Sequence, residues 1–287
     1  MYQIKLIKFR YSAIIILNLL IALSTASYAA KIEMTDYSNE LGGLLWLPCE
    51  LGRCLIDTGG RGGGLLAITP KTKMYPKLKT ITIQTLRGPM ECDLLMPIKL
   101  ELANKIYISH KMIRCEEFPA NLSPLLGLDF FQRSQFSFLF STMSFKWEYQ
   151  VENIKPIKLD KTDGWIGMTG RLLNKSVRIV FDTGAPTTLV DEVFVDDNPE
   201  LFDDVSYTSS VPGIRLVAPK VNLTVDGIVL SQKPWRVEPI SKTFKTDYQP
   251  HIMLGMNLIK YYDWHFDLGA GEVWIKPIPK IKEHLKF

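Results

Sequence analysis

Two aspartates in identical tripeptides carry the most specific chemistry in this chain of 287 residues. Asp57-Thr58-Gly59 recurs as Asp182-Thr183-Gly184, 125 residues later. Two carboxyl groups about 3 Å apart cannot both ionise easily, so they share one proton and titrate as a pair. One member then acts as a base towards water while the other donates a proton to a carbonyl group. This chemistry is hydrolysis by general acid–base catalysis, without a covalent intermediate.

Each tripeptide stands between two short apolar runs, which predict strands. The runs before it cover residues 54–56 and 179–181, and those after it cover 65–68 and 188–190. An Asp on a tight turn after a buried strand presents its carboxylate at the strand end. The following glycine permits a backbone conformation that is closed to other residues. We expect the hydroxyl of each Thr to bond to backbone.

Two further motifs repeat in the same order and at nearly the same spacing. Leu125-Leu126-Gly127 corresponds to Met253-Leu254-Gly255, 128 residues later, and aromatic-rich segments follow both. Gly88 and Gly213 each lie 31 residues after an aspartate, at turns next to β-forming residues. Such self-similarity at a fixed period indicates an internal duplication.

Short apolar or alternating runs, separated by Gly and Pro, predict a protein that is mostly β. Asp226-Gly227 predicts a hairpin turn between residues 221–225 and 228–230. Short helices are expected at 129–134, 191–194 and 257–262, with Asp129 and Asn257 as caps. The polar stretch 152–161 is interpreted as a linker between the two halves.

These motifs resemble those of aspartic peptidases of the pepsin and retropepsin group. The matching segments are Asp57-Thr58-Gly59-Gly60, Asp182-Thr183-Gly184-Ala185, Leu125-Leu126-Gly127 and Met253-Leu254-Gly255, within a repeat that spans about 41–275. The resemblance implies an all-β fold of two similar β-barrel lobes related by a pseudo-two-fold axis. The lobes would cover residues 30–155 and 156–287, with the catalytic dyad in the cleft between them.

The resemblance also assigns roles to individual residues. Thr58 and Thr183 would each bond across to the opposite lobe, and the two Leu-Gly units would pack beneath the catalytic loops. A β-hairpin flap would close over the substrate near Gly88, near Gly213 or at both. The short halves are closer to a single-chain retropepsin than to pepsin. The implied protein is a monomeric aspartic endopeptidase that acts on peptides or proteins and needs no cofactor or metal.

The residue after each tripeptide bears on the pH optimum. Many acid-active relatives have Ser or Thr there, whose hydroxyl favours the ionised carboxylate. Here the residues are Gly60 and Ala185, which carry no hydroxyl. Because the lost hydrogen bond leaves the carboxyl pKa values higher, we expect an optimum between mildly acidic and near-neutral pH.

The first residues have the layout of a secretory signal peptide, assigned to 1–29. A basic start precedes an apolar run at 13–23, and Ser27 and Ala29 form the expected cleavage signal. Eleven residues are too few to span a bilayer comfortably, so an uncleaved anchor is the less favoured alternative. Without three basic leader residues the formal net charge falls from +4 to +1, which removes any argument from charge for a nucleic-acid partner. We therefore expect an exported protein, periplasmic or secreted, with no membrane span after cleavage and no pro-segment.

Four cysteines in an exported chain predict two disulfides, with three possible connectivities. We favour Cys49–Cys54 with Cys92–Cys115, because the first two residues bracket a hairpin turn. Reduced structural thiols are the alternative, and the spacing does not fit a zinc site.

Three hypotheses for function follow from the residues. The first is the exported aspartic endopeptidase described above. The second is a catalytically silent relative that binds peptides in the same cleft. The third is another two-carboxylate hydrolase, such as a glycosidase, which would not explain the paired glycine units.

Overall fold

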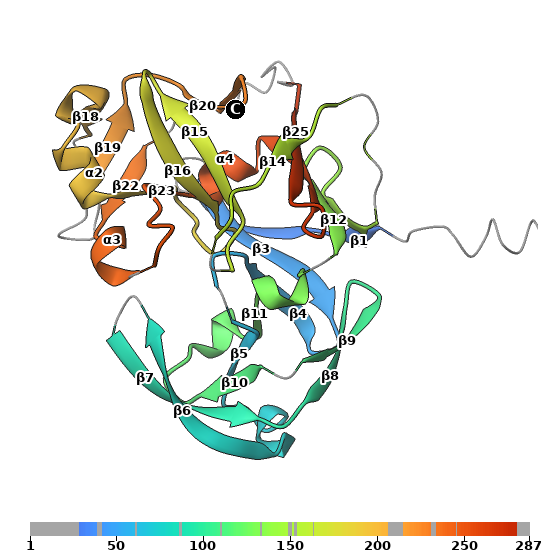
Figure 1. Cartoon of the computed structure of the whole chain (residues 1–287). Coiled ribbons are helices and arrows are strands. Elements are labelled where there is room, and N and C mark those ends of the chain that lie inside the picture. Colours follow the sequence, from blue (N-terminus) through green and yellow to red (C-terminus); the bar gives the residue numbers. More distant parts are fainter. Residues whose placement is uncertain are drawn as a thin grey trace, which may run out of the picture.

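The computed structural model describes residues 29–38, 42–60, 62–85, 88–109, 111–132, 134–148, 151, 154–162, 164–205, 215–230, 234–244 and 246–279. Its fold is mostly β, as predicted, with three sheets and a few short helices (Figure 1). The signal peptide expected at 1–29 lies outside the described residues, apart from Ala29. Within the described ranges, no helix is long and apolar enough to cross a membrane.

The first sheet is blue to green in Figure 1 and occupies its lower half. Its strands follow the order β6-β7-β10-β5-β11-β4-β3-β8-β9, and β2 pairs with β3 off this path. Their bounds are β2 Glu33–Ser38, β3 Gly42–Cys49, β4 Gly52–Asp57, β5 Gly64–Ala67, β6 Lys77–Thr85, β7 Gly88–Leu95, β8 Ile98–Leu102, β9 Lys105–Ser109, β10 Met112–Cys115 and β11 Leu125–Gly127. The 3-10 turns of this half are η1 Thr72–Met74, η2 Ala120–Leu122 and η3 Leu128–Phe130.

The second sheet is yellow to orange in Figure 1, and its order is β18-β19-β22-β17-β23-β16-β15-β20-β21. Its strands are β15 Gly167–Leu172, β16 Lys175–Phe181, β17 Leu189–Asp191, β18 Phe202–Asp204, β19 Leu216–Pro219, β20 Leu223–Val225, β21 Ile228–Leu230, β22 Trp235–Glu238 and β23 Ile252–Leu254. Its helices are α2 Glu192–Asp196, η4 Pro199–Leu201, α3 Ile240–Thr243 and α4 Met256–Ile259.

The two strand orders agree at all nine positions when each strand is numbered within its own half. In the first sheet β4 pairs in parallel with β11, so that Ile56 faces Leu126. In the second sheet β16 pairs in parallel with β23, and Phe181 faces Leu254. Equivalent strands therefore deliver the two Asp-Thr-Gly segments from equivalent places in the two sheets.

A central sheet joins the two halves, in the order β1-β13-β12-β24-β25-β14. Its strands are β1 Ala30–Lys31, β12 Gln135–Leu139, β13 Ser144–Trp147, β14 Ile157–Lys158, β24 Tyr262–Asp267 and β25 Glu272–Pro277. At its middle, β12 runs antiparallel to β24 and Ser137 faces His265. These two residues are separated by 128 positions, which is the offset of the second repeated motif. The sheet is therefore centred on a pair of equivalent residues.

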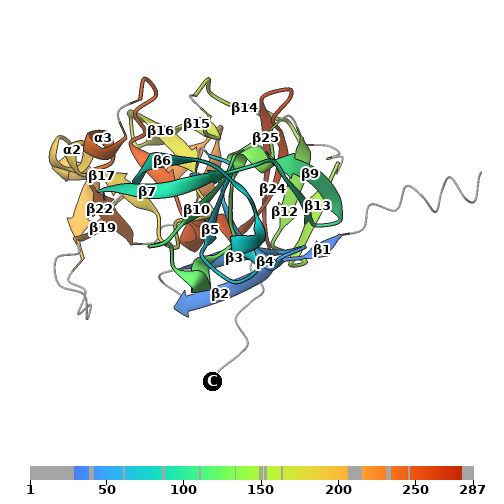
Figure 2. The same cartoon turned by 90° about the horizontal axis from the view of Figure 1, so that it is seen from below.

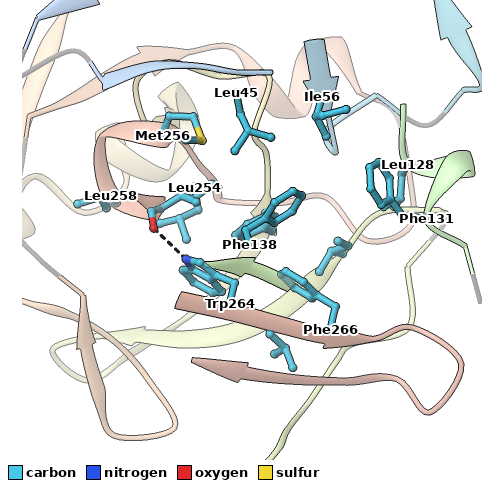
Figure 3. Packing of buried hydrophobic residues seen from close by; sticks show 14 of the residues in the cluster. Leu45, Ile56, Leu128, Phe131, Phe138, Leu254, Met256, Leu258, Trp264 and Phe266 are labelled. Carbon is cyan, nitrogen blue, oxygen red and sulfur yellow. Dashed lines mark hydrogen bonds between the residues drawn. The ribbon is translucent and has the colours of Figure 1, made fainter. Parts of the chain in front are cut away.

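One apolar core extends through all three sheets. Figure 3 shows Leu45 and Ile56 of the first sheet, Leu254 of the second, and Phe138 and Trp264 of the central sheet in one cluster. Each of these side chains is fully buried. The same cluster continues beneath both Asp-Thr-Gly segments, so their strands have little freedom to shift relative to each other.

The structure contains the predicted hairpin turn and both favoured disulfides. Asp226 and Gly227 form the predicted hairpin turn with φ values of 46° and 81°. Both favoured disulfides, Cys49–Cys54 and Cys92–Cys115, are present. The stretch 152–161 is more than the linker we expected, because it contains β14, which pairs with β25.

The expected capping roles of Asp129 and Asn257 are wrong. Asp129 instead accepts a hydrogen bond from Gln132 and pairs with Lys111 at 2.7 Å. Asn257 lies inside α4, fully buried, and bonds to a neighbouring loop. The N-cap residues of these two helices are Gly127 and Gly255. Asp129 and Asn257 lie two residues later, inside the helices, so their side-chain oxygens bond to other partners.

Candidate active site

The two aspartates come at the carboxyl ends of equivalent strands. Asp57 is the last residue of β4, and Asp182 directly follows β16. The preceding apolar residues of both strands are buried. Because burial of their side chains is favourable, packing in the core fixes the position at which each strand ends. Asp182 is 6% exposed, and Asp57 is more open to solvent.

The two threonines hold these loops together through reciprocal hydrogen bonds. Thr58 Oγ1 donates to the carbonyl of Phe181 at 2.9 Å and accepts from the amide of Thr183 at 3.0 Å. Thr183 Oγ1 donates to the carbonyl of Ile56 at 2.7 Å and accepts from the amide of Thr58 at 3.2 Å. Both side chains are completely buried. Each loop thus satisfies backbone groups of the other loop, which fixes their separation.

Gly59 and Gly184 let the carboxyl groups approach. A Cβ on Gly59 would lie 2.4 Å from Asp182 Cγ, and one on Gly184 would lie 2.4 Å from Asp57 Oδ1. Each glycine therefore packs against the aspartate of the opposite half. These contacts bring the two carboxyl groups together at the junction of the loops, and a hydrogen bond between them requires one of them to carry a proton.

The surroundings of the pair raise both pKa values. Burial raises the pKa of Asp57, while the amide of Gly60, 2.9 Å from Oδ1, and the bond from Asp182 act in the opposite direction. Burial and the negative charge of Asp57 raise the pKa of Asp182 well above its usual range. The pair therefore keeps one proton after the first ionisation, and the two carboxyl groups share it.

The two Leu-Gly motifs lie directly against the loops that follow the two aspartates. A Cβ on Gly127 would lie 2.3 Å from the carbonyl oxygen of Gly62. A Cβ on Gly255 would lie 2.4 Å from the carbonyl carbon of Thr187. Glycine is needed at both positions because backbone from the neighbouring loop occupies the space of a side chain.

A cavity of about 200 Å³ opens beside Asp57. Glycines of the 60–64 loop form one wall, and half-buried apolar side chains form the rest, contributed by Leu65, Ile83, Ile113 and Leu125. Its lining is apolar, with the Asp57 carboxylate at one end. The cavity can hold an apolar group of modest size next to the carboxyl pair.

The β6–β7 hairpin contributes Ile83 to this cavity, and Gly88 is the first residue of β7. Figure 2 shows β6 and β7 across the near side of the molecule when it is viewed from below. Gly88 therefore lies on a hairpin that reaches the candidate site. The equivalent hairpin is β18–β19, and Gly213, the other proposed flap residue, lies outside the described residues.

Two residues of the site were not predicted from the sequence. Trp165 Nε1 donates to the carbonyl of Gly59 at 2.8 Å. Asn257 Oδ1 accepts from the amide of Thr188 at 2.7 Å and from its hydroxyl at 2.8 Å, which anchors the strand after the second loop. A polar residue within the apolar segment after Gly255 was a usable signal for Asn257. No comparable signal identifies Trp165.

In the part of the chain that the structure describes, no group of three or more His, Cys, Asp or Glu side chains is arranged to hold a metal ion. The chemistry available at the site is that of the two carboxyl groups and the backbone amides around them. No protein-family model matches the chain, and no curated protein matches it either.

Proposed function

We propose that this protein is an exported aspartic endopeptidase of the pepsin and retropepsin type, built as one chain with two similar lobes. The observation that carries the proposal is the pair of carboxyl groups, Asp57 and Asp182, on two loops that the reciprocal threonine bonds and the close glycine contacts hold together. The matching strand orders of the two sheets support a duplicated fold with its site at the junction.

In the proposed reaction, water lies between the two carboxyl groups. Asp57, the ionised member, takes a proton from the water while the water oxygen bonds to the peptide carbonyl carbon. Asp182 donates its proton to the carbonyl oxygen, which gives a neutral tetrahedral diol. The C–N bond then breaks as Asp57 returns its proton to the leaving nitrogen, and Asp182 recovers a proton from a diol hydroxyl.

The substrate in this proposal is a peptide or protein segment in the cleft, and the protein acts as a monomer. An apolar side chain beside the scissile bond occupies the cavity next to Asp57. The β6–β7 hairpin, with Ile83 and Gly88, serves as a flap over that segment. The two disulfides support folding in an oxidising compartment, in line with export.

The test is cleavage of a denatured protein or a peptide library between pH 4 and 8, with and without a statine-type transition-state mimic. Asp57→Asn and Asp182→Asn are each expected to lower inhibitor-sensitive cleavage by at least about a hundredfold, because general acid–base catalysis needs both groups. Asp226→Asn is the matched control, since this residue is exposed at a turn whose positive φ suits Asn.

Normal turnover by either dyad variant would contradict the proposal. If the wild-type chain binds the inhibitor but cuts nothing across this pH range, the catalytically silent peptide-binding protein becomes the better description.

A further inference from the structure

The peptide group between Gly59 and Gly60 has a partner at each end. Its carbonyl oxygen accepts from Trp165 Nε1 at 2.8 Å, and its amide donates to Asp57 Oδ1 at 2.9 Å. Because a peptide group is planar, fixing the direction of the oxygen also fixes the direction of the N–H. The flanking residues are both glycine, whose backbone rotates more easily than that of other residues. The Gly60 amide also lies 3.1 Å from the Asp57 carbonyl oxygen, so the turn itself supplies part of the restraint and Trp165 adds to it from the other end of the peptide group.

Trp165 is firmly placed. Its amide donates to Thr162 Oγ1 at 2.9 Å, and the Thr162 hydroxyl donates back to the Trp165 carbonyl at 2.6 Å. The indole ring meets Phe244 edge-on, with 5.7 Å between ring centres and an angle of 88°. Only 6% of Trp165 is exposed, and it packs in a small cluster with Val180 and Tyr248. The indole N–H that reaches Gly59 is thus held in place by packing within the second half of the chain.

The two aspartates depend on their loops to different degrees. Asp182 Oδ1 accepts from two successive amides, those of Gly184 at 2.9 Å and Ala185 at 3.2 Å. For Asp57, the amide of Gly60 contributes most among the backbone groups that favour its charged form. The orientation of one peptide group therefore matters more for Asp57 than for Asp182.

We propose that Trp165 is a positioning residue, which holds the Gly59–Gly60 peptide so that its N–H points at Asp57 Oδ1 and favours the charged form of that carboxyl group. The catalytic meaning of this role rests on the proposed function, whereas the effect on Asp57 does not. Among the described residues, Asp182 is the one titratable group that faces Asp57 closely enough to shift its ionisation.

Trp165→Phe keeps an aromatic ring against Phe244 and removes the N–H donor. The measurement is the carboxyl ¹³C NMR titration of the aspartates, with Asp57 assigned by comparison with Asp57→Asn. We expect the pKa of Asp57 to rise by about one unit, because a hydrogen bond to the charged form is lost or disordered. The acidic limb of the kcat/KM profile for peptide cleavage should move upwards by the same amount.

Trp235→Phe is the matched control, since Trp235 is fully buried and its indole nitrogen has no hydrogen-bond partner among the described residues. It should leave the titration of Asp57 unchanged. Thr162→Val provides a second variant, which loosens the backbone of Trp165 while keeping the indole, and a smaller upward shift is expected.

An unchanged Asp57 titration in folded Trp165→Phe would overturn the proposal and leave Trp165 a packing residue. If Trp165→Phe does not fold, Thr162→Val decides, and no shift in that variant would have the same consequence. If the expected shift occurs in a protein that cleaves no peptide, the positioning role stands and the proposed function fails.

Discussion

Asp57 and Asp182 occupy the same place in the same tripeptide, and burial raises the pKa of both carboxyl groups. The negative charge of Asp57 raises the pKa of Asp182 further, because placing a second negative charge beside the first is unfavourable in a desolvated site. The pair therefore loses its two protons in separate steps. Between these steps it holds one base and one acid at the same pH, which the proposed hydrolysis requires.

For the proposed peptide cleavage, the pH profile should report the two ionisations of the pair. Below the first ionisation of the pair there is no base, and above the second there is no acid, so kcat/KM should rise and then fall with pH. Because both pKa values are raised, the maximum should lie in the mildly acidic to near-neutral range. A maximum below about pH 3.5, near or below the ordinary carboxyl pKa, would contradict this.

Ala185→Ser adds a hydroxyl beside Asp182. The Ala185 amide already lies 3.2 Å from Asp182 Oδ1, so the new oxygen starts close to the carboxyl group. A hydrogen bond to the charged form lowers a carboxyl pKa, and we expect the alkaline limb to move down by about half to one pH unit. Ala218→Ser on β19, far along the chain from the dyad, should leave that limb in place. An alkaline limb that does not move in Ala185→Ser would show that no such bond forms.

Among the elements, each Asp-Thr-Gly loop finds hydrogen-bond partners in the other half. The carbonyls of Ile56 and Phe181 are the last backbone acceptors before the two aspartates, and each receives the hydroxyl of the opposite threonine. Unpaired backbone groups in such a buried place are unfavourable. The reciprocal bonds therefore contribute to stability as well as to the geometry of the site.

Thr183→Val tests this contribution, because valine keeps the shape of the side chain and removes its hydroxyl. The Ile56 carbonyl and the Thr58 amide would both lose a partner, and we expect a loss of about 2–4 kcal/mol in the free energy of unfolding. Urea denaturation measures it. Thr224→Val, whose hydroxyl makes one long bond of 3.4 Å at the surface, should change stability by no more than about 0.5 kcal/mol. Equal losses in the two variants would contradict the expectation.

At the scale of the whole molecule, the central sheet places a titratable group in the core. His265 is 4% exposed and faces Ser137, whose Oγ lies 2.9 Å from Nδ1. Burial lowers the pKa of His265 to about 4, although the nearby Asp263 opposes this and Lys276 adds to it. The folded protein therefore keeps this imidazole neutral at pH values where an unfolded chain would protonate it.

The stability of the protein should reflect this difference. Since the unfolded state binds the proton first, stability is lost as pH falls from about 6.5 to about 4, by up to about 3 kcal/mol. His265→Asn should lose this part of the pH dependence. The raised pKa values of the dyad act in the opposite direction, but they are present in both proteins and cancel in the comparison. A difference curve that is flat between pH 4 and 7 would contradict the prediction.

Features that depend on neighbouring residues or on repetition could be predicted before the fold was known. The hairpin turn at Asp226-Gly227 and the mostly β content follow from local turn chemistry and spacing. The cysteine count predicted two disulfides, and the favoured pairing, one of three possible, is the one present. The two Asp-Thr-Gly segments were recognisable because they repeat at a fixed offset, together with the Leu-Gly units. Such signals can be recognised in the sequence because each motif consists of a few neighbouring residues, and the repeat is a second copy of the same motifs.

Contacts between residues far apart in the chain became evident in the folded structure alone. Trp165 reaches the carbonyl of Gly59 across 106 residues of chain, and Asn257 anchors Thr188 where a helix cap was expected. The stretch taken for a linker adds β14 to the central sheet, whose middle pair is Ser137 and His265. A single donor reaching a distant carbonyl leaves no periodicity or motif in the sequence. It depends on the relative placement of two packed halves, which the shared core fixes.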